Sequence, residues 1–409
     1  MQSLKIRFHI YDLLFYLLLV FSFYYTRNML CRLMMVVFFG YTVMQMIVSK
    51  SKVPLPFYYI GFIAFILYGA ANVVLGNVIN AGVARTMVVS LTLNFMMIFA
   101  IVQYIHMTGD VPRVLRVAEL GIFSTAFVVV MLSLRTITQG RLGGGTEINS
   151  NVLAILCVYG FILSMYLRKI NKLSQYANWF RMVFYILVIL LTGSRKGLLM
   201  IVLSIIVIQF AMERRGVFKK LLVIASAIAV LYFLVLNVSF LYNIIGVRVE
   251  NLLSALSGET AAEASLEDRQ KLVSLGLEYI KEKPWIGYGF DCFKLVSGIG
   301  PNGKVGIGSV GFYSHNNYIE LLFGGGIIGF TLYYLPVLYL LIKLIKRNRK
   351  NICMPYLLAM VISLLAVEYA RVTYYARVDA YITGVILGCV LIVGKDKERS
   401  IEMPKEGIN

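Results

Sequence analysis

Long apolar segments recur from one end of the chain to the other, separated by shorter polar stretches. Runs of about 18 to 22 residues recur among them, which is long enough for a helix to cross the ~30 Å hydrocarbon layer of a bilayer. We therefore predict an all-α fold, a polytopic membrane helix bundle. The pattern places twelve transmembrane helices near 10–25, 29–48, 56–76, 83–104, 114–134, 151–167, 180–192, 197–212, 219–237, 318–342, 353–370 and 378–394.

The longest polar interval lies between the ninth and tenth predicted spans and is the natural place for chemistry outside the membrane. It divides the chain into four parts. These are helices one to nine in 1–237, a large loop in 238–312, helices ten to twelve in 313–394 and a tail in 395–409.

The large loop has helix signals in its middle. Ser265 with Asp268 resembles a capping box, and apolar residues then recur at helical spacing until Pro284. We predict an amphipathic helix near 266–282 that lies along the membrane. The glycine-rich stretch that follows is expected to be irregular.

Composition and charge support a membrane protein and orient it. The chain is 59% hydrophobic and 14% charged, with mean hydropathy +0.80, which excludes an ordinary soluble domain. More than half of its 39 Lys and Arg residues fall in alternate loops on one side, which by the positive-inside rule faces the cytoplasm. Both termini are therefore expected to be cytoplasmic and the large loop to lie on the outer face. The net charge of +19 comes from the basic loops that set this orientation. We therefore do not expect nucleic acid as a partner.

Cations on the outer face are the first candidates for chemistry, because a charge at membrane depth is costly and normally has a partner. In the turn 192–197, hydroxyls, glycines and the pair Arg195 and Lys196 lie beside the start of a helix. This arrangement is typical of an anion-binding site. The alternative is a pair of interfacial cations that extend to water. Further outer-face candidates are Arg248, Arg269, Arg371 and Arg377.

His315 is the second candidate, because it lies where the large loop re-enters the membrane. A neutral imidazole there could accept a proton from a hydroxyl, whereas the alternative is a histidine that only caps or supports the helix. The other two histidines, His9 and His106, lack polar neighbours and are expected to be structural. Candidate contacts to a hydroxyl acceptor are Tyr313, Asn316, Asn317 and Glu320.

The sequence lacks the usual motifs for metals, cofactors and nucleotides. It contains no D-x-D, no H-x-x-x-H, no Walker loop and no dinucleotide fingerprint, so we expect a reaction without metal or cofactor. Four of the five cysteines lie in or beside apolar spans, and no disulfide framework is expected.

Three motifs together resemble the superfamily of O-antigen ligases and O-antigen or capsule polymerases of the bacterial envelope. They are TGSRKG at 192–197, KPWIGYG at 283–289 after the loop helix with Arg269, and SHNNYIELLFGGGIIG at 314–329. Twelve spans with a large outer loop between the ninth and tenth fit the same superfamily.

The resemblance implies a glycosyltransferase that uses undecaprenyl-diphosphate-linked oligosaccharide on the outer face of the bacterial inner membrane. Arg195 and Arg269 would bind the diphosphate, with Lys196 and Arg248 as further ligands, and His315 would act on the acceptor hydroxyl. Fixed cations suit a diphosphate leaving group, and proton removal by the imidazole would complete a displacement that inverts the anomeric carbon. Besides membrane lipid, the implied partners are the chain-length regulator and the flippase of the same pathway.

Several functions remain open at this point. The compact chain favours a polymerase that extends O-antigen or capsular polysaccharide. The alternative is an O-antigen ligase that transfers the glycan to lipid A core or another acceptor. A transporter of polysaccharide or anions would need ionisable residues along a path, for which Glu119, Glu320 and Glu368 are candidates, and a scaffold would need no site.

Overall fold

The computed structural model describes residues 9–24, 28–133, 142–143, 148–171, 174–212, 242, 264–298, 311–347 and 351–401. The regular elements in these ranges are helices. They are α1 (Ile10–Tyr24), α2 (Met29–Ser49), α3 (Phe57–Val74), α4 (Ala81–Thr108), α5 (Val111–Ser133), α6 (Ser150–Lys169), α7 (Gln175–Leu191), α8 (Arg195–Met212), α12 (Ala264–Glu282), η2 (Phe293–Leu295), α13 (Asn317–Arg347), α14 (Met354–Glu368) and α15 (Arg377–Ile401).

The all-α prediction is confirmed: the chain is a polytopic membrane helix bundle. Each predicted span within the described ranges corresponds to one helix, and the ninth span, 219–237, lies outside them. Seven of the described helices, α2 to α6, α8 and α13, are long and apolar enough to cross a membrane. The helices α1, α7 and α14 are shorter but also apolar.

Helix ends differ from the predicted ones where polar residues cap them. The helix α7 begins five residues before its predicted start because the Ser174 Oγ accepts a hydrogen bond from the Ala177 N–H at 3.2 Å. The helix α4 begins two residues early, where the Asn80 Oδ1 accepts from the Val83 N–H at 3.0 Å. It continues to Thr108 and stops at Gly109, whose φ of 65° is left-handed.

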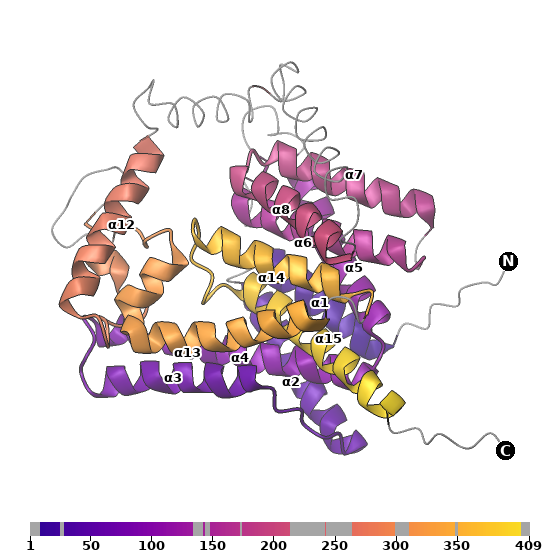
Figure 1. The fold of residues 1–409 in the computed structure, drawn as a ribbon, viewed down its shortest axis with the longest axis horizontal. Helices are drawn as coiled ribbons and strands as arrows, with labels where there is room; N and C mark the ends of the chain where they lie inside the picture. Colours follow the sequence, from indigo (N-terminus) through magenta and orange to yellow (C-terminus); the bar gives the residue numbers. More distant parts are fainter. Residues whose placement is uncertain are drawn as a thin grey trace.

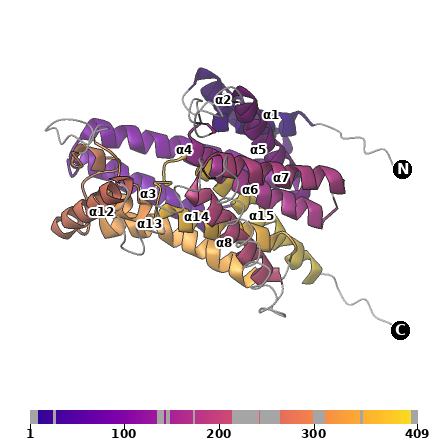
Figure 2. The ribbon, with the colours of Figure 1, turned by 90° about the horizontal axis from the view of Figure 1, so that it is seen from above.

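Most of the helices run roughly along the long axis of the molecule, and the two ends of the bundle differ (Figure 1). The first residues of α1 and the last turns of α15 lie at one end. The helix α12 crosses the other end at a steep angle to α3 and α13, and a view from above agrees with this placement (Figure 2). We call these the terminal end and the α12 end.

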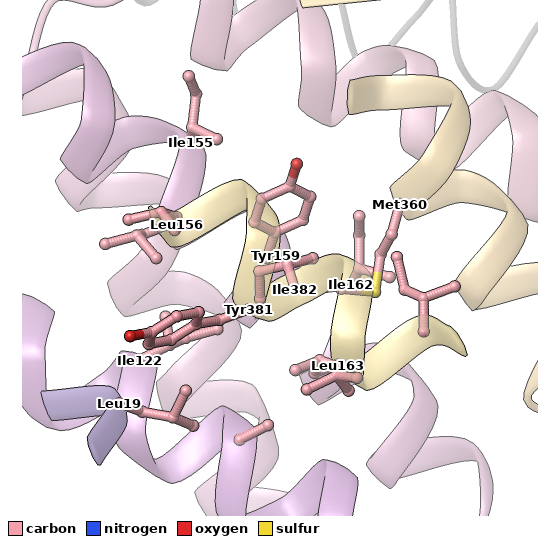
Figure 3. Close-up of a cluster of buried hydrophobic side chains, with 14 of the residues drawn as sticks. Leu19, Ile122, Ile155, Leu156, Tyr159, Ile162, Leu163, Met360, Tyr381 and Ile382 are labelled. Carbon is pink, nitrogen blue, oxygen red and sulfur yellow. The ribbon is translucent and has the colours of Figure 1, made fainter. Parts of the chain in front are cut away.

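The helix α6 lies at the centre of the bundle. Its sequence carries no charged side chain before Arg168, so it is apolar on all sides and almost all of it is buried. Side chains of α6 pack there against α1, α5, α14 and α15 (Figure 3). The labelled members of this cluster are Leu19, Ile122, Ile155, Leu156, Tyr159, Ile162, Leu163, Met360, Tyr381 and Ile382.

Two glycines let α15 approach α4 closely. A Cβ at Gly384 would lie 3.3 Å from the Ile98 Cα, and one at Gly388 would lie 2.6 Å from the Ile105 Cδ1. Small residues four apart bring helix backbones together in membrane proteins. This contact fixes α15, and with it the segment between α14 and α15 that reaches the α12 end.

Candidate active site

The predicted loop helix exists as α12, and it packs on α13. Leu272 is buried against Ile319 and Phe323, and a Cβ at Gly276 would lie 2.4 Å from the Ile319 Cγ2. The apolar face of this helix was predicted to contact the membrane surface. Much of that face instead packs against α13. This packing holds Arg269, in the first turns of α12, in a fixed position over the start of α13.

The segment after α12 interrupts α13. Gly326 has a left-handed φ of 59°, so α13 consists of a short first part and a longer second part. Backbone bonds from the 284–289 segment complete the break: Tyr288 N–H to Phe323 O at 2.8 Å, Gly289 N–H to Gly324 O at 2.9 Å, and Ile327 N–H to Pro284 O at 2.8 Å. The KPWIGYG motif and the glycines of the third motif are thus two sides of one junction, and a Cβ at Gly326 would lie 2.3 Å from the Trp285 carbonyl.

His315 lies at the apex of a tight turn that leads into α13. The Ser314 N–H donates to Glu320 Oε2 at 2.8 Å, and the Ser314 hydroxyl donates to the Asn316 carbonyl at 2.8 Å. The Asn316 Oδ1 caps the helix by accepting from the N–H groups of Tyr318 and Ile319, at 3.0 and 3.2 Å. His315 itself has φ 55°, which places it in the left-handed region. For a residue other than glycine this conformation costs about 1 kcal/mol or more, and such strain is found mainly at functional sites.

Aromatic rings flank the His315 imidazole. The Tyr313 ring centroid lies 4.2 Å away and that of the exposed Phe312 lies 6.1 Å away. Burial, followed by the positive charges of Arg269 and Lys196, lowers the pKa of His315 to about 4. The imidazole is therefore neutral at physiological pH and has a nitrogen that can accept a proton.

Cations from three separate parts of the chain influence the pKa values of Tyr313 and His315. Lys196 from α8 and Arg269 from α12 both act on the pKa of His315. Burial raises the pKa of Tyr313, and Arg371 and Arg269 oppose this increase. Lys196 also donates a hydrogen bond to the Ala370 carbonyl, which joins α8 to the segment after α14. The structure thus gathers positive charge beside a neutral histidine.

The turn 192–197 positions Arg195 and Lys196, but its hydroxyls have structural partners. The Thr192 Oγ1 donates to the Ile189 carbonyl at 2.6 Å. The Ser194 Oγ donates to Asn151 Oδ1 at 3.0 Å and accepts from the Gly197 N–H at 3.4 Å. Both hydroxyls are buried, so they shape the turn, in contrast to the expected contact with an anion. Arg195 and Lys196 are half-buried at the start of α8.

The four residues predicted to contact an acceptor fall into two groups. Asn316, Asn317 and Glu320 are buried and support the turn, whereas Tyr313 is partly exposed. The Asn317 Oδ1 accepts from the N–H groups of Thr373 and Tyr374, at 2.8 and 3.0 Å, and its Nδ2 donates to the Tyr334 hydroxyl at 2.9 Å. Asn317 therefore attaches the start of α13 to the segment between α14 and α15.

The buried carboxylates proposed as a transport path have local partners. Glu119 interacts with Arg181, with the Tyr185 hydroxyl at 2.9 Å and with the Ser164 hydroxyl at 3.1 Å. Glu368 accepts from Thr373 at 2.5 Å and from Tyr334 at 2.8 Å. These bonds support the packing of neighbouring helices, and they give no indication of a chain of carboxylates across the bundle.

The remaining outer-face candidates do not form one group. Arg371 forms an ion pair with Asp379 at 2.9 Å, and Arg377 Nη1 contacts the Cys31 Sγ at 3.3 Å. Arg248 lies outside the described residues. In the part of the chain that the structure describes, no three His, Cys, Asp or Glu residues are grouped to hold a metal ion.

A comparison with protein families finds a match over the part of the chain that contains Lys196, Arg269 and His315. Residues 180–334 match the family model described as O-antigen ligase. This span is therefore similar to the O-antigen ligase family, and the match supports the resemblance that the three sequence motifs indicated. Members of the family are glycosyltransferase-type enzymes. No curated protein matches the chain.

The O-antigen ligase span contains α8, α12 and the His315 turn, whereas Arg371 and Asp379 lie beyond its end. Arg371 was only one of several outer-face cations in the sequence, and nothing local connected it with Tyr313. The role of Asn317 as an anchor for 373–374 was also missed. The only signal in the sequence was a polar residue next to the helix cap, and Asn317 was predicted to contact the acceptor.

Proposed function

We propose that this membrane glycosyltransferase polymerises undecaprenyl-diphosphate-linked oligosaccharide repeat units into O-antigen or capsular polysaccharide. The observation that carries the proposal is the position of His315, a neutral imidazole in a strained turn, beside Lys196 and Arg269 from two other helices. The two ends of the described chain, at α1 and α15, lie opposite this site (Figure 1). With cytoplasmic termini, the site would face the outer side of the inner membrane, where the lipid-linked glycan is presented.

The reaction follows from this arrangement. The oxygen of the acceptor hydroxyl forms a bond to the anomeric carbon of the donor sugar, while the bond from that carbon to the diphosphate oxygen breaks. The hydroxyl proton passes to the unprotonated nitrogen of His315, and undecaprenyl diphosphate leaves with the electron pair. Lys196, Arg269 and the adjacent Arg195 stabilise the negative charge that develops on the leaving group. Attack from the opposite face inverts the anomeric carbon.

Substrate binding would also adjust the base. Without substrate, Arg269 and Lys196 disfavour a protonated imidazole and so lower the pKa of His315. A diphosphate between these cations and His315 adds negative charge, which raises the pKa of His315 toward its ordinary value. The histidine would thus become a stronger base when the donor is bound.

The test is a reconstituted reaction with purified protein in lipid and one defined undecaprenyl-diphosphate oligosaccharide, with products separated by size. We expect a ladder of lengthened lipid-linked glycan that is lost in His315→Ala. Transfer only after addition of lipid A core or another acceptor would identify a ligase instead. Absence of transfer to every acceptor, combined with movement of the lipid-linked glycan across the bilayer, would contradict both and favour a transporter.

A further inference from the structure

A cavity lies at the terminal end of the bundle, at the opposite end from α12. It has a volume of about 530 Å³ and is lined by the first turns of α1 and α5 and by residues near the ends of α2 and α4. The polar residues that line it include Asp12, Tyr41, Gln45, Ser51, Thr108 and Arg113. We call this cavity the terminal pocket. The proposed transfer reaction does not use it.

An ion pair fixes the only described arginine in the pocket lining. The Arg113 Nε donates to Asp12 Oδ2 at 2.7 Å, and its Nη2 lies 2.5 Å from the same oxygen. The other oxygen of Asp12 accepts from the Tyr104 hydroxyl at 2.6 Å. Asp12 is buried and both of its carboxylate oxygens accept hydrogen bonds, while the Arg113 side chain remains about one-third exposed. Within the described ranges, Nη1 of Arg113 makes no hydrogen bond, so one edge of the guanidinium can bind a ligand.

Neutral donors line the same cavity. The Tyr41 hydroxyl, the Gln45 amide and the Ser51 hydroxyl make no side-chain hydrogen bond among the residues that the structure describes. A guanidinium edge together with several neutral donors suits an anion with several oxygen acceptors. Phosphate has this chemistry, and arginine binds it through two parallel hydrogen bonds.

The surroundings favour the phosphate of a lipid over a water-soluble phosphate. On α2, next to Gln45, the apolar side chains of Met44, Ile47 and Val48 are 47%, 72% and 73% exposed. This face can accommodate acyl chains in the bilayer. Lys50 and Lys52 follow directly after α2 and add the positive charge that attracts anionic headgroups.

We propose that the terminal pocket binds the phosphate of an anionic phospholipid, with Arg113, Gln45 and Ser51 as its polar ligands. The acyl chains lie along the exposed face of α2. Asp12 holds Arg113 in position and keeps the pocket from accumulating excess positive charge. The bound lipid thereby joins the ends of α2 and α4, which meet at this pocket.

The experiment measures binding of short-chain phosphatidylglycerol to the purified full-length protein in a neutral detergent, by native mass spectrometry and by titration. Gln45→Leu and Ser51→Leu each remove one polar ligand and leave the Asp12–Arg113 pair intact. We expect about fivefold weaker binding in each, the effect of one lost hydrogen bond. Gln175→Leu, the same change on the exposed first turn of α7, is the matched control and should bind as the parent does.

Two further ligands distinguish the source of the phosphate. Phosphatidylcholine, which has the same phosphate but no net charge, should bind more weakly than phosphatidylglycerol. Glycerol 3-phosphate should bind weakly because it lacks acyl chains. The proposal is overturned if both leucine variants bind phosphatidylglycerol like the control, or if phosphatidylcholine binds equally well. Tight binding of glycerol 3-phosphate would reject the lipid and identify a site for a soluble phosphate.

Discussion

The backbone N–H of Ser314 donates a 2.8 Å hydrogen bond to Oε2 of Glu320, six residues further along the chain. The bond closes the turn around His315 and holds that residue in its left-handed conformation. Glu320 is buried, and its Oε1 has no hydrogen-bond partner among the described residues. Its placement therefore makes Glu320 a positioning residue for His315.

Loss of this hydrogen bond should impair turnover more than binding. We expect Glu320→Ala to lower kcat by about 10- to 100-fold, because small displacements of a reacting group are costly, with a smaller change in KM. Glu320→Gln keeps an acceptor for the Ser314 N–H and should recover most of the activity. Steady-state kinetics in proteoliposomes would show this, with Glu278→Ala on the exposed face of α12 as control. Full kcat in Glu320→Ala would rule out the positioning role.

Removal of the imidazole should abolish transfer without unfolding the protein. His315→Ala is expected to lose at least about 100-fold in rate, the usual contribution of a general base. His315 is half-buried in a turn, so the variant should insert and purify normally. His106→Ala, in the last turn of α4, is the control and should retain activity. Comparable rates in the two variants would contradict the assignment of the base.

The pH dependence of kcat/KM should depend on the positive charges near His315. The base must be unprotonated, so kcat/KM falls as pH drops through the pKa of His315, which is about 4 in the free protein. Lys196→Gln removes a positive charge that disfavours the protonated imidazole. The pKa should therefore rise, and the acid limb of the kcat/KM profile should move to higher pH. Lys346→Gln, at the far end of α13, should leave the limb unchanged. If the acid limb of the kcat/KM profile does not move in Lys196→Gln, then Lys196 does not influence the pKa of His315.

The Asn317 side chain should be important for stability. Asn317→Ala removes three hydrogen bonds and leaves the N–H groups of Thr373 and Tyr374 without an acceptor. Each buried group left unsatisfied costs about 1 to 3 kcal/mol, so the Tm in detergent should fall by several degrees. Gln270→Ala removes an exposed amide on α12 and should leave the Tm unchanged. Equal Tm values for the two variants would contradict the anchoring role.

The break in α13 should tolerate only glycine. In Gly326→Ala the new side chain would sit on a residue with a left-handed φ of 59°. Its Cβ would also lie 2.3 Å from the Trp285 carbonyl, a backbone group that cannot move aside as a flexible side chain could. We expect a loss of more than about 2 kcal/mol in the free energy of unfolding, with loss of activity because the start of α13 shifts. Gly40→Ala provides the matched control, since a Cβ there meets no atom within 4 Å. Thermal denaturation followed by circular dichroism would compare them.

Local pattern was sufficient for the helices. Hydrophobic spans predicted each apolar helix within the described ranges, because helix formation in a membrane depends on the segment's own apolar length and backbone bonding. The helix α12 was predicted from its capping residues and helical spacing, whereas the short helix η2 was not predicted. Ends were less well predicted: α7 starts at Gln175 because Ser174 caps it, and that signal lies outside the apolar run. The break at Gly326 was also missed, because the hydrogen bonds that permit it come from residues 284–289.

The sequence by itself determined the residue types of the candidate site: two adjacent cations at the start of α8, an arginine in α12 and a histidine before α13. Only the tertiary structure decided that Lys196, Arg269 and Arg371 share the surroundings of residues 313–315, and that Asn317 is an anchor. Hydropathy and capping depend on neighbours within a few positions. Electrostatic and hydrogen-bonded contacts between residues more than forty positions apart depend on how the helices pack.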